Sequence, residues 1–190
     1  MKRWRSRDAQ LPWTAPYWTA APDCGSARLV RSPAAYARAN LGEEEGEMAK
    51  VDDVAALILE RRGPMDTWKF QKLMYYCQAW HLVWESTSLF PDRIEAWANG
   101  PVVPSLYAQH RGQYELPAWP SGSPGNLTED EISTIEAVLK AYGSKTGHWL
   151  SVLTHHEPPW KDARRGLGEG ERGHSEITLE AMAEYYGNLV

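Results

Sequence analysis

The sequence predicts a mainly α-helical protein: a compact bundle of about six helices around one buried central helix, with a small β-hairpin or extended segment near residues 93–98. Two observations support this fold class. Apolar residues recur at three- and four-residue steps through most of the chain, and residues 66–85 are apolar nearly all round. Strict alternation, which is typical of a strand, occurs only at residues 93–98. A chain of 190 residues with 43% hydrophobic content can bury one core.

The first 47 residues contain four prolines and show neither helical nor strand periodicity. Glycine and glutamate codons at residues 42–47 can spell a purine-rich ribosome-binding sequence, so Met48 is expected to be the true start. Residues 1–47 contain seven basic and six acidic residues, a net charge of +1. Residues 48–190 contain 13 basic and 19 acidic residues, a net charge of −6. The alternatives are a disordered arm over residues 1–47 or an extra helix around residues 33–40. Residues 48–190 are expected to form a single domain.

Two helices are predicted at the start of this domain. Residues 51–62 carry one apolar stripe, with acids early and arginines late, and end at Gly63. The central helix follows over residues 66–85, with Asp66 as its N-cap. It contains too many polar residues to be a membrane span.

A polar turn over residues 86–92 should follow, with Leu89 and Phe90 as apolar anchors. The alternating segment then ends at Asn99-Gly100-Pro101, where Gly100 is expected to have a positive φ. Pro104 suits the first turn of a short helix that ends near Gly112.

Residues 113–126 contain three prolines and two glycines and are predicted to be a loop. Thr128 begins a capping box for a helix over residues 129–142, and another helix begins near Thr146. A single turn is expected over residues 160–164, then a glycine-rich loop, then a last helix capped by Ser175 or Thr178.

The side chains that could perform chemistry do not form a recognisable active site. His155, His156 and Glu157 are adjacent, whereas a chelating pair on a helix needs a spacing of three or four, so they are expected to cap a helix end. His81 is expected to be a hydrogen-bonded core residue and Cys77 an inert thiol. No phosphate loop or dinucleotide fingerprint is present. We therefore expect no catalytic residues, no metal and no cofactor.

Lys69 and Lys72 lie on the first turns of the central helix. Long cationic side chains on an apolar helix usually extend to solvent, so both lysines are expected to do so or to pair with acids such as Glu95.

The net charge of −5 and the absence of a dense basic run in the second half make nucleic acid an unlikely partner class. Two cysteines, no signal peptide and no anchor fit a cytoplasmic protein. Seven tryptophans lie between residues 68 and 160; tryptophan anchors cores and dominates protein interfaces. A binding module is therefore favoured over an enzyme.

Two segments resemble a known family. They read KFQKLMYYCQAWH at residues 69–81 and IEAWANGPVVPSLY at residues 94–107, and a looser match continues to the Pro-Pro-Trp ending at residue 160. Together they are similar to the Panacea domain, also called the SocA-like or GepA-like antitoxin domain of bacteria and phages. The resemblance covers most of residues 50–187, whereas residues 1–47 have no counterpart.

The resemblance implies an antitoxin of a toxin–antitoxin pair, which neutralises a cognate toxin, commonly encoded by an adjacent gene, by direct protein binding. The family-motif and candidate toxin-binding residues carried over by position are Lys69, Lys72, Tyr76, Trp80, His81, Glu95, Trp97, Gly100, Pro101, Val103, Pro104 and Tyr107. Gly100 and Pro101 would set a sharp bend that Trp97 closes. Two alternatives stay open: a proteolytic or regulatory adaptor that binds a client protein, and a metal-dependent enzyme.

Overall fold

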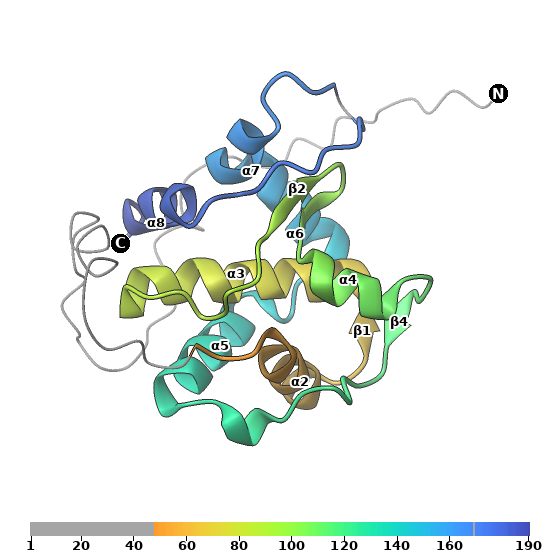
Figure 1. Cartoon of the computed structure of the whole chain (residues 1–190), viewed down its shortest axis with the longest axis vertical. Helices are drawn as coiled ribbons and strands as arrows, with labels where there is room; N and C mark the ends of the chain where they lie inside the picture. Colours follow the sequence, from red (N-terminus) through yellow and green to blue (C-terminus); the bar gives the residue numbers. More distant parts are fainter. Residues whose placement is uncertain (1–47, 169) are drawn as a thin grey trace.

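The computed structural model describes residues 48–168 and 170–190 (Figure 1). The expectations for residues 1–47 lie outside these residues. The described part contains seven α-helices: α2 (Val51–Arg62), α3 (Thr67–Glu85), α4 (Pro104–His110), α5 (Glu129–Tyr142), α6 (Gly147–His156), α7 (Pro158–Ala163) and α8 (Leu179–Gly187). Four short strands accompany them: β1 (Met65–Asp66), β2 (Glu95–Trp97), β3 (Gly100–Val102) and β4 (Glu115–Leu116). The prediction of a mainly α-helical fold is confirmed.

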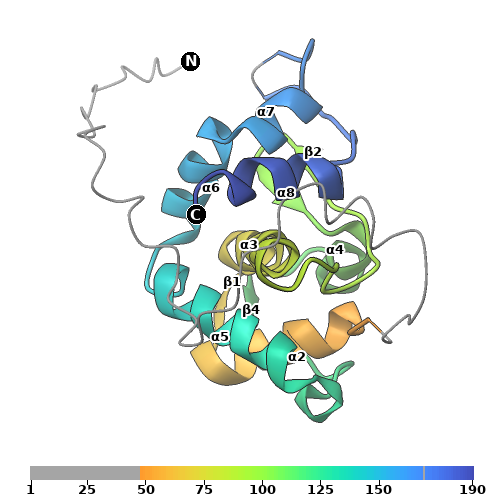
Figure 2. The ribbon, with the colours of Figure 1, turned by 90° about the vertical axis from the view of Figure 1, so that its left-hand side faces the viewer.

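Helix α3 is the centre of the molecule. Figure 2 looks nearly along its axis and shows α2, α4, α5, α6 and α8 arranged around it. Of its 19 residues, 15 are buried, which explains why its sequence is apolar on almost every side. Helices α5, α6 and α8 make its most extensive helix contacts. The prediction of a buried central helix is therefore confirmed.

The predicted helix starts agree with the observed caps. The side chain of Asp66 accepts a hydrogen bond of 2.8 Å from Lys69 N, and Thr128 and Glu131 form a complete capping box. Thr146 caps α6 in the same way. Of the two residues predicted to cap the last helix, Thr178 does so, accepting from Ala181 N at 3.2 Å. Each cap satisfies a backbone N–H that the helix itself leaves unpaired.

The turn after α3 is fixed from within the core. The amide oxygen of Gln78 accepts hydrogen bonds from Leu89 N and Phe90 N, and its amide nitrogen donates to Phe90 O. The buried Leu89 and Phe90 side chains anchor the segment as predicted.

Strands β2 and β3 form the predicted hairpin, with Glu95 opposite Val102 and Trp97 opposite Gly100. Gly100 has a φ of +106°, also as predicted. Residues 175–177 extend the hairpin: Ala96 N donates to Ser175 O and Ile177 N to Ile94 O, both at 2.8 Å.

Two features differ from the prediction. The segment expected to be a loop, residues 113–126, contains β4, which pairs with β1 through Met65 and Leu116, and a single 3-10 turn at Pro124–Asn126. Strands of two residues are too short to produce a periodic signal. Helix α7 begins at Pro158, two residues earlier than the predicted turn, because proline is well suited to the first position of a helix.

None of the helices in residues 48–168 and 170–190 is long and apolar enough to cross a membrane.

Candidate functional site

The hairpin is held on α3 by two polar side chains of that helix. The amide oxygen of Gln71 accepts a hydrogen bond of 2.8 Å from Val103 N. From the next residue of the helix, Lys72 Nζ donates to Pro101 O at 3.1 Å. A Cβ at Gly100 would overlap the end of the Lys72 side chain, which would have to move, and the φ of +106° itself favours glycine. The expected sharp bend at Gly100 and Pro101 is thus present and is fastened to α3.

The expectation that Lys72 extends to solvent is wrong. Its side chain is buried, with 2% of the residue exposed, because the hairpin covers it and a backbone carbonyl replaces water. Burial lowers the pKa of Lys72 to about 7. Lys69 remains partly exposed, and burial followed by the charge of Arg62 lowers its pKa. The acid suggested as a partner, Glu95, pairs with Arg93 instead.

A second buried polar group joins α3 to the C-terminal part of the chain. Glu157 lies between α6 and α7, and its Oε2 accepts hydrogen bonds from Tyr76 OH at 3.1 Å and Tyr186 OH at 2.8 Å. The hydroxyl of Tyr75 lies 3.3 Å from that of Tyr186. Burial raises the pKa of Glu157 to about 8, although both tyrosine hydrogen bonds oppose this shift. Its protonated, neutral form is therefore favoured in the fold at neutral pH.

Trp80 and His81 are core residues. Trp80 stacks on Trp84 at 5.2 Å between ring centroids, and its Nε1 donates to Tyr142 OH at 3.2 Å. His81 Nδ1 lies 3.1 Å from Thr134 Oγ1, and burial lowers the pKa of His81 to about 4. Its imidazole is therefore neutral at physiological pH, and its prediction as a hydrogen-bonded core residue is confirmed.

Residues 155–157 do not converge on one point. His155 stacks on Trp160 at 4.1 Å, His156 Nδ1 lies 2.7 Å from Val152 O, and Glu157 contacts the tyrosines. His156 thus meets a carbonyl at the end of α6, as the capping interpretation predicts. Within residues 48–168 and 170–190, no group of three or more His, Cys, Asp or Glu side chains could hold a metal ion. Burial raises the pKa of the Cys77 thiol.

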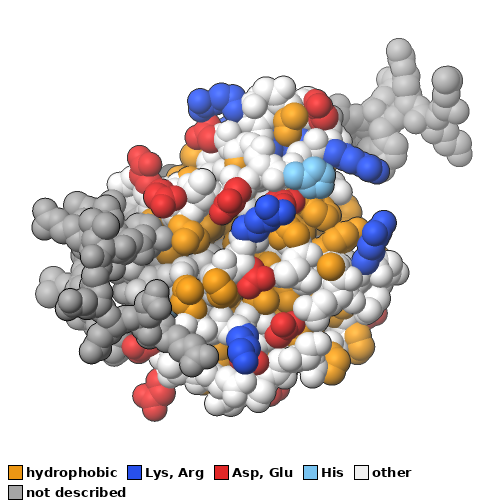
Figure 3. All heavy atoms as spheres, viewed as in Figure 1, with side chains coloured by type: hydrophobic (Ala, Val, Ile, Leu, Met, Phe, Trp, Pro, Cys, Tyr) orange, Lys and Arg blue, Asp and Glu red, His pale blue; other side chains and the backbone are white. Residues whose placement is uncertain are grey.

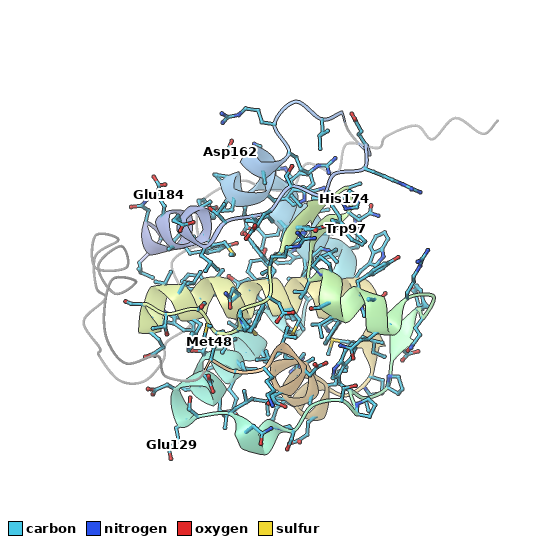
Figure 4. All side chains as sticks on the ribbon, in the orientation of Figure 1. Met48, Trp97, Glu129, Asp162, His174 and Glu184 are labelled. Atoms are coloured by element: carbon cyan, nitrogen blue, oxygen red, sulfur yellow. The ribbon has the colours of Figure 1, made fainter. Side chains whose placement is uncertain are left out.

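Three further motif residues, Glu95, Trp97 and Tyr107, belong to a cluster that we call the Trp97 patch. It consists of Arg93, Glu95, Trp97, Tyr107 and His174, and Figure 4 labels Trp97 and His174 beside the hairpin. The Glu95 carboxylate accepts from Trp97 Nε1 at 2.7 Å and lies 3.1 Å from His174 Nδ1 and 2.7 Å from Arg93 Nη2. The Trp97 ring meets the Tyr107 ring edge to face, with 4.7 Å between centroids. The Trp97 and Tyr107 side chains are partly exposed.

The structure therefore divides the twelve motif residues. Glu95, Trp97 and Tyr107 lie in the Trp97 patch; Lys72, Gly100, Pro101 and Val103 fasten the hairpin to α3; and Tyr76, Trp80 and His81 lie in the core. Lys69 lies near the start of α3, and Pro104 begins α4.

Three residues of these sites were not predicted from the sequence: Gln71, Arg93 and His174. The contacts of Glu157 with the tyrosines were not predicted either. Gln71 lies within the motif at residues 69–81. An amide side chain on a mostly apolar helix indicates a buried hydrogen bond, so its role could have been predicted. Nothing in the sequence placed His174 beside Glu95, which lies 79 positions earlier.

Comparison with known families agrees with the resemblance. Residues 70–161 match the model of the family described as Antitoxin SocA-like, Panacea domain. This segment runs from the first turn of α3 to α7, and it includes the hairpin and Glu157. No curated protein and no solved structure matches the chain significantly.

Proposed function

We propose that this chain, whose residues 70–161 match the antitoxin SocA-like, Panacea domain, is an antitoxin that neutralises a cognate toxin by direct protein binding in the cytoplasm. This proposal rests on the family match. The fold supports it, because the matched segment contains the whole of the hairpin and all but the first turn of the central helix.

We propose further that the protein acts by binding and not by catalysis. Three polar side chains of the matched segment have structural partners that support this proposal: Lys72 holds the hairpin, His81 contacts Thr134, and Glu157 Oε2 joins Tyr76 to Tyr186. The Trp97 patch, in contrast, offers partly exposed aromatic and charged groups, which are the residue types that dominate protein interfaces.

The test is bacterial growth. The protein encoded by the adjacent gene is expressed from an inducible promoter, alone and together with the full chain, and colony formation is counted. The proposal predicts that the neighbour alone stops growth and that co-expression restores it. A matched control carries this gene with an early stop codon, so that the RNA is made without the protein.

A folded, soluble chain that leaves the toxicity of the neighbour unchanged would contradict the proposal for that pair.

A further inference from the structure

We propose that helix α8 is a cover that opens while the rest of the fold stays closed, and that the proton on Glu157 keeps it shut. This inference goes beyond the proposed function, because it concerns a movement within this chain and needs no partner. Three observations support it: α8 is held on one face only, the residues before it form a hinge, and it is hydrogen-bonded to a buried carboxyl group that has one unpaired oxygen.

Helix α8 is the least buried of the three helices that pack most extensively on α3. Two of its nine residues, Met182 and Tyr186, are buried, whereas α5 and α6 each bury five. Its outer face carries Glu180 and Glu184, which are exposed and form no ion pair within the described part of the chain. Figure 3 shows acidic side chains on this side of the molecule, where Figure 4 labels Glu184. Elements with few buried contacts are those that open at the lowest free energy.

The residues before α8 provide a hinge. Two backbone hydrogen bonds of 2.8 Å join residues 175–177 to residues 94–96, and Ile177 is 2% exposed, so this segment stays attached to the hairpin. The next residue, Thr178, caps α8. A rotation of the backbone at Thr178 therefore moves the helix as a unit without breaking the pairing with β2.

Glu157 holds the other end of α8. Its Oε2 accepts a hydrogen bond of 2.8 Å from Tyr186 OH, and the Tyr186 hydroxyl also lies 3.3 Å from that of Tyr75. The second oxygen, Glu157 Oε1, is buried and has no hydrogen-bond partner among the described residues. A neutral carboxyl group tolerates this position, but an ionised carboxylate needs donors or water at both oxygens. Water reaches Glu157 when α8 moves away, so ionisation favours the open form.

The charge of Glu157 makes this opening depend on pH. Burial raises the pKa of Glu157 to about 8 in the closed form, against 4.5 for the ordinary group. In the open form water surrounds the carboxyl group and its pKa returns to the ordinary range, so the open form releases a proton that the closed form keeps. The opening equilibrium therefore rises with pH between 4.5 and 8, by at most about tenfold per pH unit, and levels off above 8.

The titratable groups that face Glu157 from α3, α5 and α8 do not change charge in this range. All of them are tyrosines, and burial raises the pKa of each above its ordinary value of 10. They are Tyr75 and Tyr76 on α3, Tyr142 on α5, and Tyr185 and Tyr186 on α8.

The charged side chains of α6 and α7 are directed elsewhere. Burial lowers the pKa of His155 to about 4, so His155 is neutral above about pH 5, and Arg164 donates to backbone carbonyls. His156, Lys161 and Asp162 are exposed. Lys72 on α3 titrates in the same range, since burial lowers its pKa to about 7, but it lies beneath the hairpin and is present equally in a Glu157 variant.

Opening of α8 uncovers motif residues that the closed fold buries. The Tyr186 ring lies 5.4 Å from the Trp80 ring and 6.2 Å from the Tyr76 ring, measured between centroids. Trp80 and Tyr76 belong to the matched segment, residues 70–161, whereas α8 lies outside it. The open and closed forms thus differ in whether this face of α3 is accessible.

The experiment measures hydrogen exchange of the purified full chain by mass spectrometry at pH 5.5, 6.5 and 7.5. Exchange rates are converted to protection factors, which removes the intrinsic pH dependence of amide exchange, and peptides from α5 and α6 are the internal reference. Glu157→Gln keeps the shape of the side chain but cannot ionise. Tyr186→Phe removes the hydroxyl that contacts Glu157, and its matched control, Tyr185→Phe, removes a hydroxyl that makes no hydrogen bond to a described residue. Circular dichroism shows whether each variant is folded.

We expect α8 of the wild type to be protected at least about tenfold less than α5 and α6, and its protection to fall by up to about tenfold per pH unit. In Glu157→Gln, the protection of α8 should stay within about threefold across the pH series. At pH 5.5, Tyr186→Phe should lower it by about tenfold and Tyr185→Phe by less than about threefold.

Two results would overturn this inference. Equal protection of α8, α5 and α6 in the wild type would show that α8 opens only with the whole fold. The same fall with pH in the wild type and in Glu157→Gln would show that Glu157 does not keep the cover shut. If Glu157→Gln does not fold, equal protection of α8 in Tyr186→Phe and Tyr185→Phe would contradict the inference instead. None of these measurements involves a toxin, so the antitoxin function is tested separately by growth.

Discussion

The carboxyl group of Glu157 accepts a hydrogen bond of 2.8 Å from the hydroxyl of Tyr186, 29 residues later in the chain. The same oxygen accepts from Tyr76, so one buried acid joins α3, the α6–α7 junction and α8. Its burial has a measurable consequence for stability.

Replacing Glu157 with glutamine should change how stability depends on pH. The pKa of Glu157 is about 8 in the fold against about 4.5 for the ordinary group, so between these values the folded state holds a proton that the unfolded state releases. Wild-type stability therefore falls as pH rises from 4.5 to 8, by at most about a tenfold change in the unfolding equilibrium per pH unit. Glu157→Gln keeps the shape and cannot titrate, so it should lose this dependence. Urea unfolding at pH 5, 6.5 and 8 measures it, and parallel curves for the two proteins would contradict the account.

Lys72 should produce the opposite slope. Its pKa is about 7 in the fold against 10.5 for the free group, so between pH 7 and 10.5 the unfolded state binds a proton that the folded state lacks. The contribution of Lys72 to the free energy of unfolding therefore rises with pH across this window. Lys72→Met keeps an unbranched side chain but has no amine, so it should not show this rise. Unfolding of both proteins at pH 7, 8.5 and 10 is the measurement; tyrosine titration is common to both and cancels. An equal rise in the variant would show that Lys72 is not the source.

Trp80→Ala should lower the free energy of unfolding by about 3 to 5 kcal/mol, because Trp80 is buried and leaves a large cavity. The half-exposed Trp149 provides the control: Trp149→Ala should stay within about 1 kcal/mol of the wild type. Chemical unfolding followed by far-UV circular dichroism measures both. Similar losses at the two positions would show that the burial of Trp80 does not determine its contribution.

Gly100→Ala should destabilise the fold by at least about 1 kcal/mol, since its φ of +106° strains any residue with a Cβ. The added Cβ would also lie 2.4 Å from Lys72 Cε. Gly125→Ala is the matched control, because there the nearest atom is Ser123 Oγ at 3.8 Å and no positive φ is involved. A wild-type melting temperature for Gly100→Ala would mean that the hairpin can leave α3 without cost.

The sequence predicted those parts of the fold that local physics determines. Helical periodicity located α2, α3, α5 and α6, and the side chains of Asp66, Thr128 and Thr146 marked three of the starts. Asn99-Gly100-Pro101 located the hairpin turn. Each of these signals lies within a few residues of the structure that it predicts.

The buried polar contacts depend on distant partners and could not be predicted in this way. The sequence predicted that Lys72 reaches solvent or pairs with an acid, because the carbonyl that replaces water belongs to Pro101, 29 residues away. The sequence predicted only that Glu157 belongs to a helix end, since its tyrosine partners are on α3 and α8. The Trp97 patch likewise needs residues 93–97, 107 and 174 to be brought together by the fold.

The most direct test of the account is whether the purified chain alone inhibits the purified toxin. The two proteins are mixed without any protease, and complex formation is followed by size-exclusion chromatography while the activity of the toxin is assayed. Direct neutralisation predicts a stable complex and loss of toxin activity in proportion to the amount of chain added. A toxin that stays active in the mixture, and is neutralised in cells only when a protease is present, would contradict direct neutralisation and identify the chain as an adaptor.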